Sequence, residues 1–233
     1  MIAIIGRGNV ATHLFRAFKK NNEEACLVNP HTLEGLPADA DLTLICVSDN
    51  AICEVVKKLP SSLPLVAHTS GSIPGSVLGD KFKNYGVFYP LQTFTKDVEL
   101  NYKEIPVFIE GDSEKTVEKI KHFASAFSHN IFEADSEKRR KLHLASVFAC
   151  NFTNALAGIA QNILKEADID KTVINPLMRQ TLKKLDYMDA GAAQTGPAKR
   201  KDDIVINSHL QMLKDHPDLM QIYKSISDLI REQ

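Results

Sequence analysis

The sequence predicts an α/β fold in which a parallel-sheet domain is followed by an all-α domain. Short β-branched runs alternate with helix-like stretches from residue 2 to about residue 135, which is the rhythm of parallel βαβ units. Strand-like runs almost vanish after Asp135. A turn that contains two glycines joins the first strand-like run to the first helix-like stretch. We therefore divide the chain into residues 1–135 and residues 136–233.

Seven short apolar runs are candidate strands, and most lack polar alternation, as expected for strands that are covered on both faces. These runs are residues 2–5, 25–28, 42–47, 65–68, 86–89, 106–110 and 130–133. Apolar residues at helical spacing predict helices at residues 10–18, 51–58 and 114–127.

The second half of the chain reads as helical. Residues 136–167 form one long candidate helix with Ser136 as its N-cap. Further helices are predicted at residues 171–186 and 202–230, the last of them broken near Pro217.

The composition is that of an ordinary globular protein, and the lack of an apparent signal or membrane segment predicts a location in the cytoplasm. The chain has 233 residues with 28 basic and 29 acidic groups, and this balance favours neither nucleic acid nor an anionic membrane as a partner. No apolar run approaches the roughly 18 residues of a membrane helix, so we expect no membrane segment. The four cysteines form no CxxC pair, which predicts reduced, buried thiols and no metal site.

The glycine turn has the spacing of a dinucleotide-binding loop. Gly6 permits a tight turn, Gly8 lets backbone approach a pyrophosphate, and the small Ala11 allows close packing of helix and sheet. Free N–H groups at the start of the helix would face the phosphate charge. The pattern therefore predicts a Rossmann-like NAD(P)-binding domain in which Arg7, Asn9 and Val10 also contact the cofactor. A tight turn without a ligand is the alternative.

The end of the second strand indicates which cofactor binds. An NAD site usually has a carboxylate there for the ribose 2′-hydroxyl, but this region reads Leu-Val-Asn-Pro-His-Thr. Asn29, His31 and Thr32, with Arg7, would tolerate a 2′-phosphate. The sequence thus favours NADP(H), with NAD(H) as the alternative; a plain surface turn would also explain these residues.

Small polar residues follow two more strands, at the edge where open α/β sheets bind ligands. We predict that these residues contact the cofactor: Val47, Ser48, Asp49, Thr69, Ser70 and Gly71. His68, which ends the fourth strand, is a candidate catalytic group. Gln92, after the fifth strand, is a candidate substrate contact. Ordinary turn chemistry is the competing explanation for all of them.

The long helix and a later loop carry further candidates. His143, Asn151 and Asn154 fall in one broad band at 100° per residue within an apolar segment, and buried polar groups there need partners. We take His143 and Asn151 as candidate catalytic groups and Asn154 as a substrate contact. The loop around residues 194–202 suits an anion. Its candidate substrate contacts are Thr195, Gly196, Pro197 and Arg200.

The whole chain resembles a bacterial family that joins an NADP-binding Rossmann-like domain to a helical domain of unknown function. The matching segments are GRGNVATHL, VSDNAI, HTSG, YPLQTF, HLASVFACNF, and TGPAKRKD followed by His209-Leu210. More distantly, it is similar to pyrroline-carboxylate reductase, ketopantoate reductase and the β-hydroxyacid dehydrogenases. The resemblance implies a homodimer that binds substrate between its domains. The family pattern has His at position 89 and Gly at position 201, where this chain has Tyr89 and Lys201.

These observations predict an NADP-dependent oxidoreductase that transfers hydride between the nicotinamide and a small C=O or C=N compound. His143, Asn151 or His68 would meet the charge that grows on the substrate, and Arg200 would anchor a substrate carboxylate. A non-catalytic NADP(H) sensor is the alternative, because Lys141 lies ten residues before Asn151 and so forms no Lys-xxx-Asn signature. A methyltransferase is disfavoured because the turn opens a helix at once.

Overall fold

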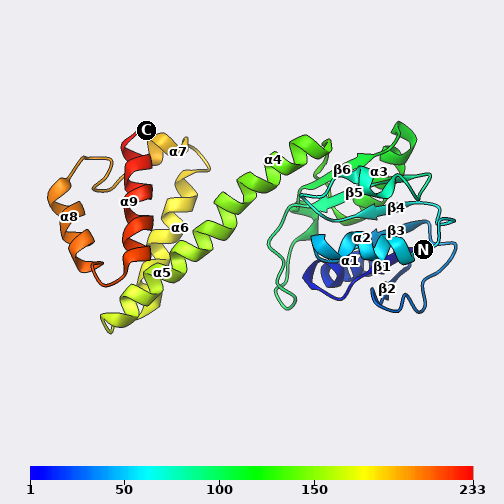
Figure 1. Cartoon of the computed structure of the whole chain (residues 1–233), viewed down its shortest axis with the longest axis horizontal. Coiled ribbons are helices and arrows are strands. Elements are labelled where there is room, and N and C mark those ends of the chain that lie inside the picture. The colour runs from blue at the N-terminus through cyan, green and yellow to red at the C-terminus, as the bar shows by residue number, and fades with distance from the viewer. Residues whose placement is uncertain (233) are drawn as a thin grey trace. The chain divides into compact units, whose positions relative to one another are not determined.

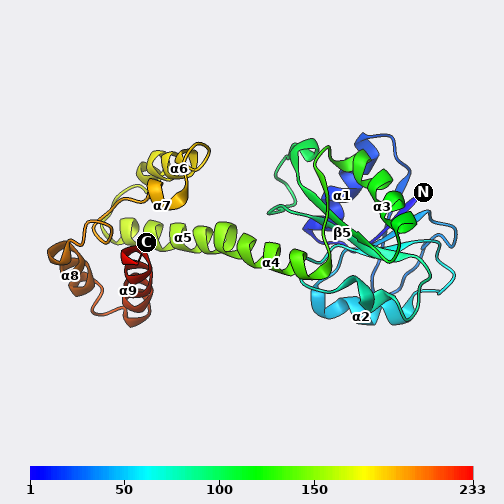
Figure 2. The ribbon, with the colours of Figure 1, turned by 90° about the horizontal axis from the view of Figure 1, so that it is seen from above.

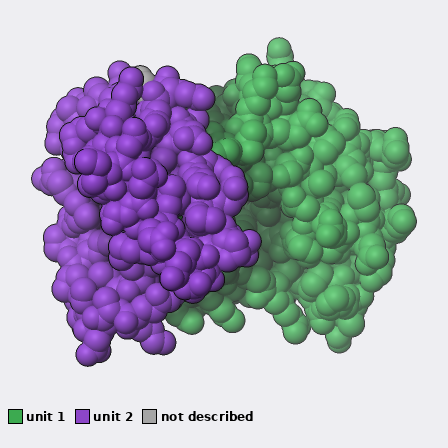
Figure 3. Space-filling view, turned by 60° about the vertical axis from the view of Figure 1, so that its left-hand side comes forward, with its two compact units in different colours: residues 1–156 green, residues 157–233 purple. Residues whose placement is uncertain are grey.

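A computed structural model describes residues 1–232, which form two compact units. The first is Met1–Leu156 and the second begins at Ala157 (Figure 3). The division falls inside a long helix that starts at Ser136, the position at which the sequence predicted the second domain to begin. The two units are described separately below.

The first unit is built on one seven-stranded sheet, with strand order β2-β1-β3-β4-β5-β6-β7 (Figure 1). All seven strands were predicted, with ends that differ by at most two residues. They are β1 (Ile2–Ile5), β2 (Ala25–Val28), β3 (Leu42–Ile45), β4 (Val66–His68), β5 (Tyr85–Pro90), β6 (Val107–Gly111) and β7 (Ile131–Glu133). The strand order reverses between β1 and β3, where open α/β sheets bind ligands.

The prediction of a wholly parallel sheet was wrong at one pair of strands. β6 runs antiparallel to β5, whereas β6 and β7 are parallel to each other. The reason is the connection, because residues 91–106 contain only the short 3₁₀ turn η2 (Tyr102–Glu104) and no crossover helix. A strand can be paired in parallel with the preceding one only after such a crossover.

Helices cover both faces of the sheet (Figure 2). α1 (Asn9–Lys20) and α3 (Glu114–Phe127) pack on the face formed by Ile2, Ile4 and the residues in register with them. α2 (Asp49–Lys58) packs on the opposite face, which carries Ala3 and Ile5. The strands are therefore buried on both sides, which explains their lack of polar alternation.

The predicted long helix spans residues 136–166 but changes its winding in the middle. It consists of α4 (Ser136–Ser146), a π-helical segment η3 (Val147–Phe152) and α5 (Thr153–Glu166). The N-cap is Asp135, whose carboxylate accepts a hydrogen bond from the backbone N–H of Lys138, so the prediction of Ser136 as the cap was wrong by one residue. The Ser136 hydroxyl instead donates a hydrogen bond to the carboxylate of Glu110.

The second unit is helical, as predicted. It contains the remainder of α5 and then η4 (Lys171–Ile174), α6 (Asn175–Lys184), α7 (Ala190–Ala193), α8 (Asp203–Met212) and α9 (Pro217–Arg231). The predicted break at Pro217 is the first residue of α9. His209 Nδ1 lies 2.8 Å from the Tyr223 hydroxyl, and Arg231 pairs with Asp203, so α8 and α9 pack as an antiparallel pair.

Two expectations from composition need correction. The sequence analysis predicted no membrane segment, but the helix over residues 136–166 is long and apolar enough to span a membrane by length and composition alone. None of its most apolar 18-residue window is buried within the part of the chain that the structure describes. The four cysteines are free, but Cys53 is exposed and only Cys46 is fully buried.

Candidate functional site

The glycine turn between β1 and α1 has the geometry that its spacing predicted. Gly6 has φ +148°, and a Cβ added there would lie 2.2 Å from the carbonyl oxygen of Cys46. Gly8 is the N-cap of α1, in an extended conformation, and nothing lies within 4 Å of a Cβ added to it. Gly6 is therefore required by the fold itself. Gly8 faces open space beside N–H groups that the helix leaves free.

A pocket of about 320 Å³ lies where β1, β3 and β4 end. Its lining residues are Gly6, Arg7, Gly8, Asn9, Val10, Pro30, Cys46, Val47, Ser48 and Thr69. The fold thus brings together eight of the predicted cofactor contacts from three separate segments of the chain. Ala11 is a buried residue of α1, and Asp49 is exposed at the start of α2. These residues fit a dinucleotide, since a bare turn and a helix N-terminus meet small polar side chains at the point where the strand order reverses.

The segment after β2 is a turn stabilised by its own side chains. Asn29 Oδ1 accepts a hydrogen bond from the backbone N–H of His31, and the Thr32 hydroxyl accepts one from Glu34 N–H. Their neighbour Pro30 lines the pocket, and the side chains of Arg7, His31 and Thr32 are exposed. The turn bonds leave the His31 ring and the Arg7 guanidinium available to a phosphate.

His68 is a structural residue of the turn after β4. Its side chain is fully buried, its Nδ1 accepts a hydrogen bond from Ser70 N–H, and its Nε2 donates to the carbonyl of Pro74. Burial lowers the pKa of His68 to about 4. Ser70 has a similar role, because its Oγ accepts hydrogen bonds from Ser72 N–H and Ile73 N–H. This geometry supports turn formation for both residues, against the catalytic role predicted for His68.

Tyr89 and His143 meet beside that turn, and the sequence reasoning missed Tyr89. The Tyr89 hydroxyl lies 3.1 Å from His143 Nδ1, and the two rings are T-shaped. Gly71 lies against both rings, since an added Cβ would come within 2.7 Å of His143 Nδ1 and 2.8 Å of Tyr89 Cζ. The signal that could have found Tyr89 was its position next to the end of a parallel strand, at the ligand-binding edge.

Arg139 fixes the start of α4 against the sheet. Its guanidinium is fully buried and pairs with Glu110 of β6, and a second nitrogen donates to the carbonyl of Ile73 at 2.6 Å. Ser136 Oγ donates to Glu110 and accepts from Gly75 N–H. Since His143 lies one turn beyond Arg139, this cluster places the His143 ring against the turn after β4.

Three side chains of α1 hold the loop that follows β5. Asn9 Nδ2 donates to the carbonyl of Phe94, His13 Nε2 donates to that of Thr95, and Arg16 donates to that of Lys96. His13 also contacts the Tyr102 hydroxyl through Nδ1, at 3.0 Å. His13 is buried because this loop covers that face of α1. Gln92, at the start of the loop, is exposed, and its Oε1 accepts from Thr93 N–H.

Asn151 lies in the π-helical segment η3, and Asn154 follows it. Both residues are exposed. Single-turn π segments inside α-helices are frequent at functional sites. A π turn takes more residues than an α turn, so the band that was predicted at 100° per residue is rotated after residue 147.

The candidate loop of the second unit has a positive φ at two positions. Gly196 has φ +109° and Lys201 has φ +56°. Thr195 and Arg200 are exposed, and Gly196 and Pro197 are half-buried. The left-handed conformation of Lys201 is one that glycine adopts more readily, because such a φ suits a residue without a Cβ.

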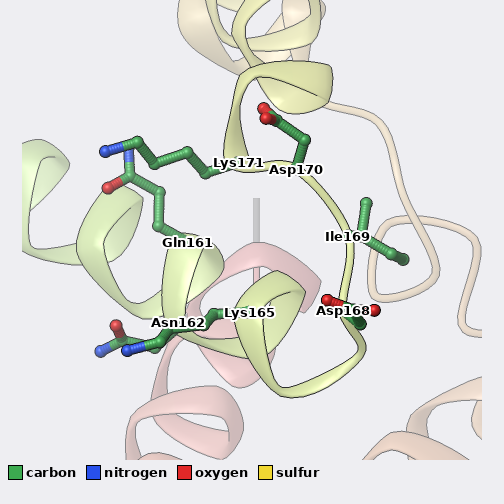
Figure 4. A pocket seen from close by; sticks show the side chains of 7 residues that line it. All are labelled: Gln161, Asn162, Lys165, Asp168, Ile169, Asp170 and Lys171. Carbon is green, nitrogen blue, oxygen red and sulfur yellow. The ribbon is translucent and has the colours of Figure 1, made fainter.

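A larger pocket of about 530 Å³ belongs to the second unit (Figure 4). It is lined by Gln161, Asn162, Lys165, Asp168, Ile169, Asp170 and Lys171, at the turn between α5 and η4. None of these residues was predicted as part of a site. Its charged side chains are of both signs and spread around an open depression, which gives it no convergent set of polar groups.

Comparison with known proteins finds similar structures among oxidoreductases that use NADP. A protein of Bacteroides fragilis assigned as an NADP oxidoreductase is 36% identical with a TM-score of 0.92, and the match covers 100% of this chain and 98% of that one. A reductive aminase of Aspergillus terreus, solved with NADPH and ethyl levulinate, has 14% identity and a TM-score of 0.72, with 99% and 93% covered. Curated protein sequences gave no match.

A third similar structure is the 1-pyrroline-5-carboxylate reductase of Streptococcus pyogenes, with 12% identity, a TM-score of 0.63 and 100% and 98% of the two chains covered. The fold is thus that of Rossmann-like NADP-binding oxidoreductases with a mostly helical C-terminal region, as predicted. Within this class, the chain belongs to the family described as "Domain of unknown function (DUF2520)", whose profile matches residues 105–230.

Proposed function

We propose that this protein is an NADP-dependent oxidoreductase that transfers hydride between the nicotinamide and a small C=O or C=N compound. The observation that carries the proposal is the pocket at the ends of β1, β3 and β4, where a bare glycine turn opens α1. Reduced nicotinamide, when bound, supplies the hydride. The chain supplies binding, orientation and a proton.

The pyrophosphate would lie against Gly6, Gly8 and the first turn of α1. No acidic side chain is present in that turn, so the partial positive charge of the helix N-terminus is left for the phosphates. Asn9 has its amide nitrogen committed to Phe94, so Asn9 would contact the cofactor through its backbone N–H.

The nicotinamide would lie on the side of the pocket that Val47, Ser48 and Thr69 line. Ser48 and Thr69 have hydroxyl groups at the ends of strands. The Thr69 hydroxyl donates a hydrogen bond to the carbonyl of Ile45, which fixes its orientation. Fixed polar groups of this kind orient a ring without filling its space. Orientation of the two reactants is the source of much of the rate in hydride transfer.

NADP(H) is favoured over NAD(H) because the turn after β2 offers Arg7, Asn29, His31 and Thr32 and no carboxylate. The Aspergillus terreus reductive aminase was solved with NADPH, which agrees with this preference. The substrate contacts Gln92, Asn154, Thr195, Gly196, Pro197 and Arg200 remain predictions, as does a role for Asn151.

We also propose a soluble, cytoplasmic homodimer. Apart from Ala198 and Ile206, the apolar side chains described after residue 136 are not fully buried, and many large ones are exposed, including Phe148 in η3 and Leu177 in α6. A second copy of the chain would cover them. It would also explain an exposed apolar face on the long helix without a membrane.

Two measurements test the proposed function. Calorimetric titration with NADPH and NADH should give binding of both, with NADPH about 10-fold tighter or more. Oxidation of NADPH across a panel of keto acids, ketones and cyclic imines should then identify a substrate class. Arg7→Ala should reduce the preference for NADPH and leave NADH binding nearly unchanged.

Each outcome has a clear meaning. Turnover with any member of the panel supports the oxidoreductase. Tight NADPH binding without turnover across the panel favours the sensor. If folded protein gives no heat of binding in the titrations with NADPH and NADH, the cofactor assignment is wrong, and the proposed enzymatic function is wrong with it.

A further inference from the structure

Tyr89 and His143 form a hydrogen-bonded pair that joins the sheet to the long helix. Tyr89 is at the end of β5 and His143 is in α4, and both belong to the first unit. The Tyr89 oxygen and His143 Nδ1 are 3.1 Å apart. Both side chains are half-buried, so each keeps a route to solvent or to a ligand.

The pair lies close to the cofactor pocket because β5, which carries Tyr89, is the neighbour of β4 in the sheet. β5 is parallel to β4, with Val87 in register with His68, so Tyr89 extends beyond the end of β4. The residue after His68 is Thr69, which lines the pocket, and Gly71 packs against both rings of the pair. Only a residue without a side chain at position 71 lets the two rings come this close to the turn.

Burial keeps the Tyr89 side chain a protonated phenol. Burial is the main reason that its pKa is raised above 10, with a smaller contribution of the same sign from Asp49. Ser146 and Arg139 act in the opposite direction, but Arg139 is paired with Glu110. His68 offers no competing proton, because both of its nitrogens are held by backbone groups. Tyr89 is thus a protonated donor at neutral pH.

We propose that Tyr89 is the proton donor of the reaction and that His143 is its positioning residue, an inference that rests on the proposed function. In the reduction of a carbonyl, hydride adds to carbon, the C=O π electrons move to oxygen, and that oxygen takes the proton of the Tyr89 hydroxyl. His143 orients the hydroxyl through Nδ1 and returns a proton from solvent to the phenolate. NADPH, a proton and the carbonyl compound become NADP⁺ and an alcohol.

The test compares three substitutions: one removes the Tyr89 hydroxyl, one separates Tyr89 from His143, and one replaces the hydroxyl by another proton donor. Tyr89→Phe keeps the ring and removes the donor, so kcat for a carbonyl substrate should fall about 100-fold or more while the Kd for NADPH stays within about twofold. Gly71→Ala should also lower kcat, because its methyl group separates the pair. Tyr89→His keeps a donor and should recover a large part of the rate.

A matched control is available in the same unit. Tyr102 contacts His13 Nδ1 at 3.0 Å, so Tyr102→Phe removes a hydrogen bond between the same two kinds of atom from a pair outside the cofactor pocket. Its kcat should remain close to that of the wild type. The reduction of a cyclic imine that is already protonated needs no proton from the protein, so Tyr89→Phe should affect that reaction less than carbonyl reduction.

A second readout needs no cofactor. The ¹⁵N NMR signal of His143 Nδ1 should move in Tyr89→Phe and stay in place in Tyr102→Phe. An unchanged kcat in Tyr89→Phe, or equal losses for Tyr89→Phe and Tyr102→Phe, would overturn the proposal. Failure of wild-type protein to bind or oxidise NADPH would instead overturn the proposed function, and the NMR result would still report whether the pair forms.

Discussion

The two glycines of the turn between β1 and α1 are present for different physical reasons. Gly6 has a φ that L side chains rarely adopt, and its added Cβ would collide with the carbonyl of Cys46, so the fold requires it. Gly8 has an ordinary extended φ of −79° and open space around it. The fold itself does not require glycine at position 8. The close approach of a ligand would explain why glycine is present there.

We therefore predict separate effects for the two alanine variants. Gly6→Ala should lower the free energy of unfolding by on the order of 3 kcal/mol, because strain and a backbone clash add. Gly8→Ala should change it by less than about 1 kcal/mol and raise the Kd for NADPH at least 10-fold, because the methyl group would meet the pyrophosphate.

Urea unfolding and calorimetry on the same preparations measure both effects. A Gly8→Ala variant that binds NADPH as the wild type does would contradict the proposed position of the pyrophosphate.

His68 should make the protein sensitive to mild acid. Its folded pKa of about 4 is below the ordinary 6.5, so between these pH values the unfolded chain binds a proton that the folded chain excludes. This contribution to stability is complete above pH 6.5 and is lost as the pH falls toward 4. The loss is on the order of 3 kcal/mol.

Equilibrium unfolding at several pH values, on wild type and His68→Gln, tests this. The glutamine side chain has a donor and an acceptor but does not titrate, so the difference in unfolding free energy between the two proteins should narrow as the pH falls from 6.5 to 4. Parallel curves would show that His68 is not the group responsible.

At the scale of elements, the start of α4 depends on one buried ion pair. Arg139 has no exposed surface, and Glu110 compensates its charge, while Arg139 Nε has no hydrogen-bond partner in the part of the chain that the structure describes. A buried charge whose partner is removed is strongly unfavourable. The turn after β4 depends on the same group through the carbonyl of Ile73.

Glu110→Gln should therefore lower the free energy of unfolding by about 3 kcal/mol. Lys141→Ala is the control, because it breaks the exposed Lys141–Glu137 pair on the same helix and should change stability by less than about 0.5 kcal/mol. Thermal or urea unfolding gives both values. Equal effects of the two substitutions would mean that burial does not govern the Arg139 pair.

The elements of the sheet could be predicted from residues alone because burial on both faces leaves a direct pattern in each strand. The direction of β6 could not be read from its own residues, although the missing crossover helix before it was visible. The π-helical winding of η3 also left no signal, since the apolar spacing around residues 147–152 fits an α-helix nearly as well.

At the scale of the whole molecule, the second half of the chain lacks a core of its own. Of the twenty-one large apolar side chains that are exposed within residues 1–232, seventeen lie after residue 136. An interface between two copies that buries more than about 1,000 Å² would remove much of this surface from water. We expect the dimer and the stability of this region to be linked.

Light scattering during gel filtration should give the mass of a dimer, with a Tm that rises with protein concentration. Leu177 in α6 is 65% exposed. Leu177→Glu should shift the protein toward monomer, because it puts a charge on the apolar surface that the second copy would cover. Val98→Glu, at an exposed apolar residue of the first unit, should not. A monomeric wild type at micromolar concentration would contradict the proposed dimer.

The sequence by itself determined the order and type of nearly every element and the position of the glycine turn. These properties depend on local spacing: apolar residues repeat with the period of the element, and Gly6 and Gly8 reflect backbone geometry within a few residues.

Only the tertiary structure decided which polar residues meet. It joined Gly6, Ser48 and Thr69 in one pocket, gave both nitrogens of His68 to its own turn, and brought Tyr89 to His143 across 54 residues of chain. Such contacts depend on strand register and on how a helix packs, which are set by the whole core and leave no pattern in the residues that they bring together.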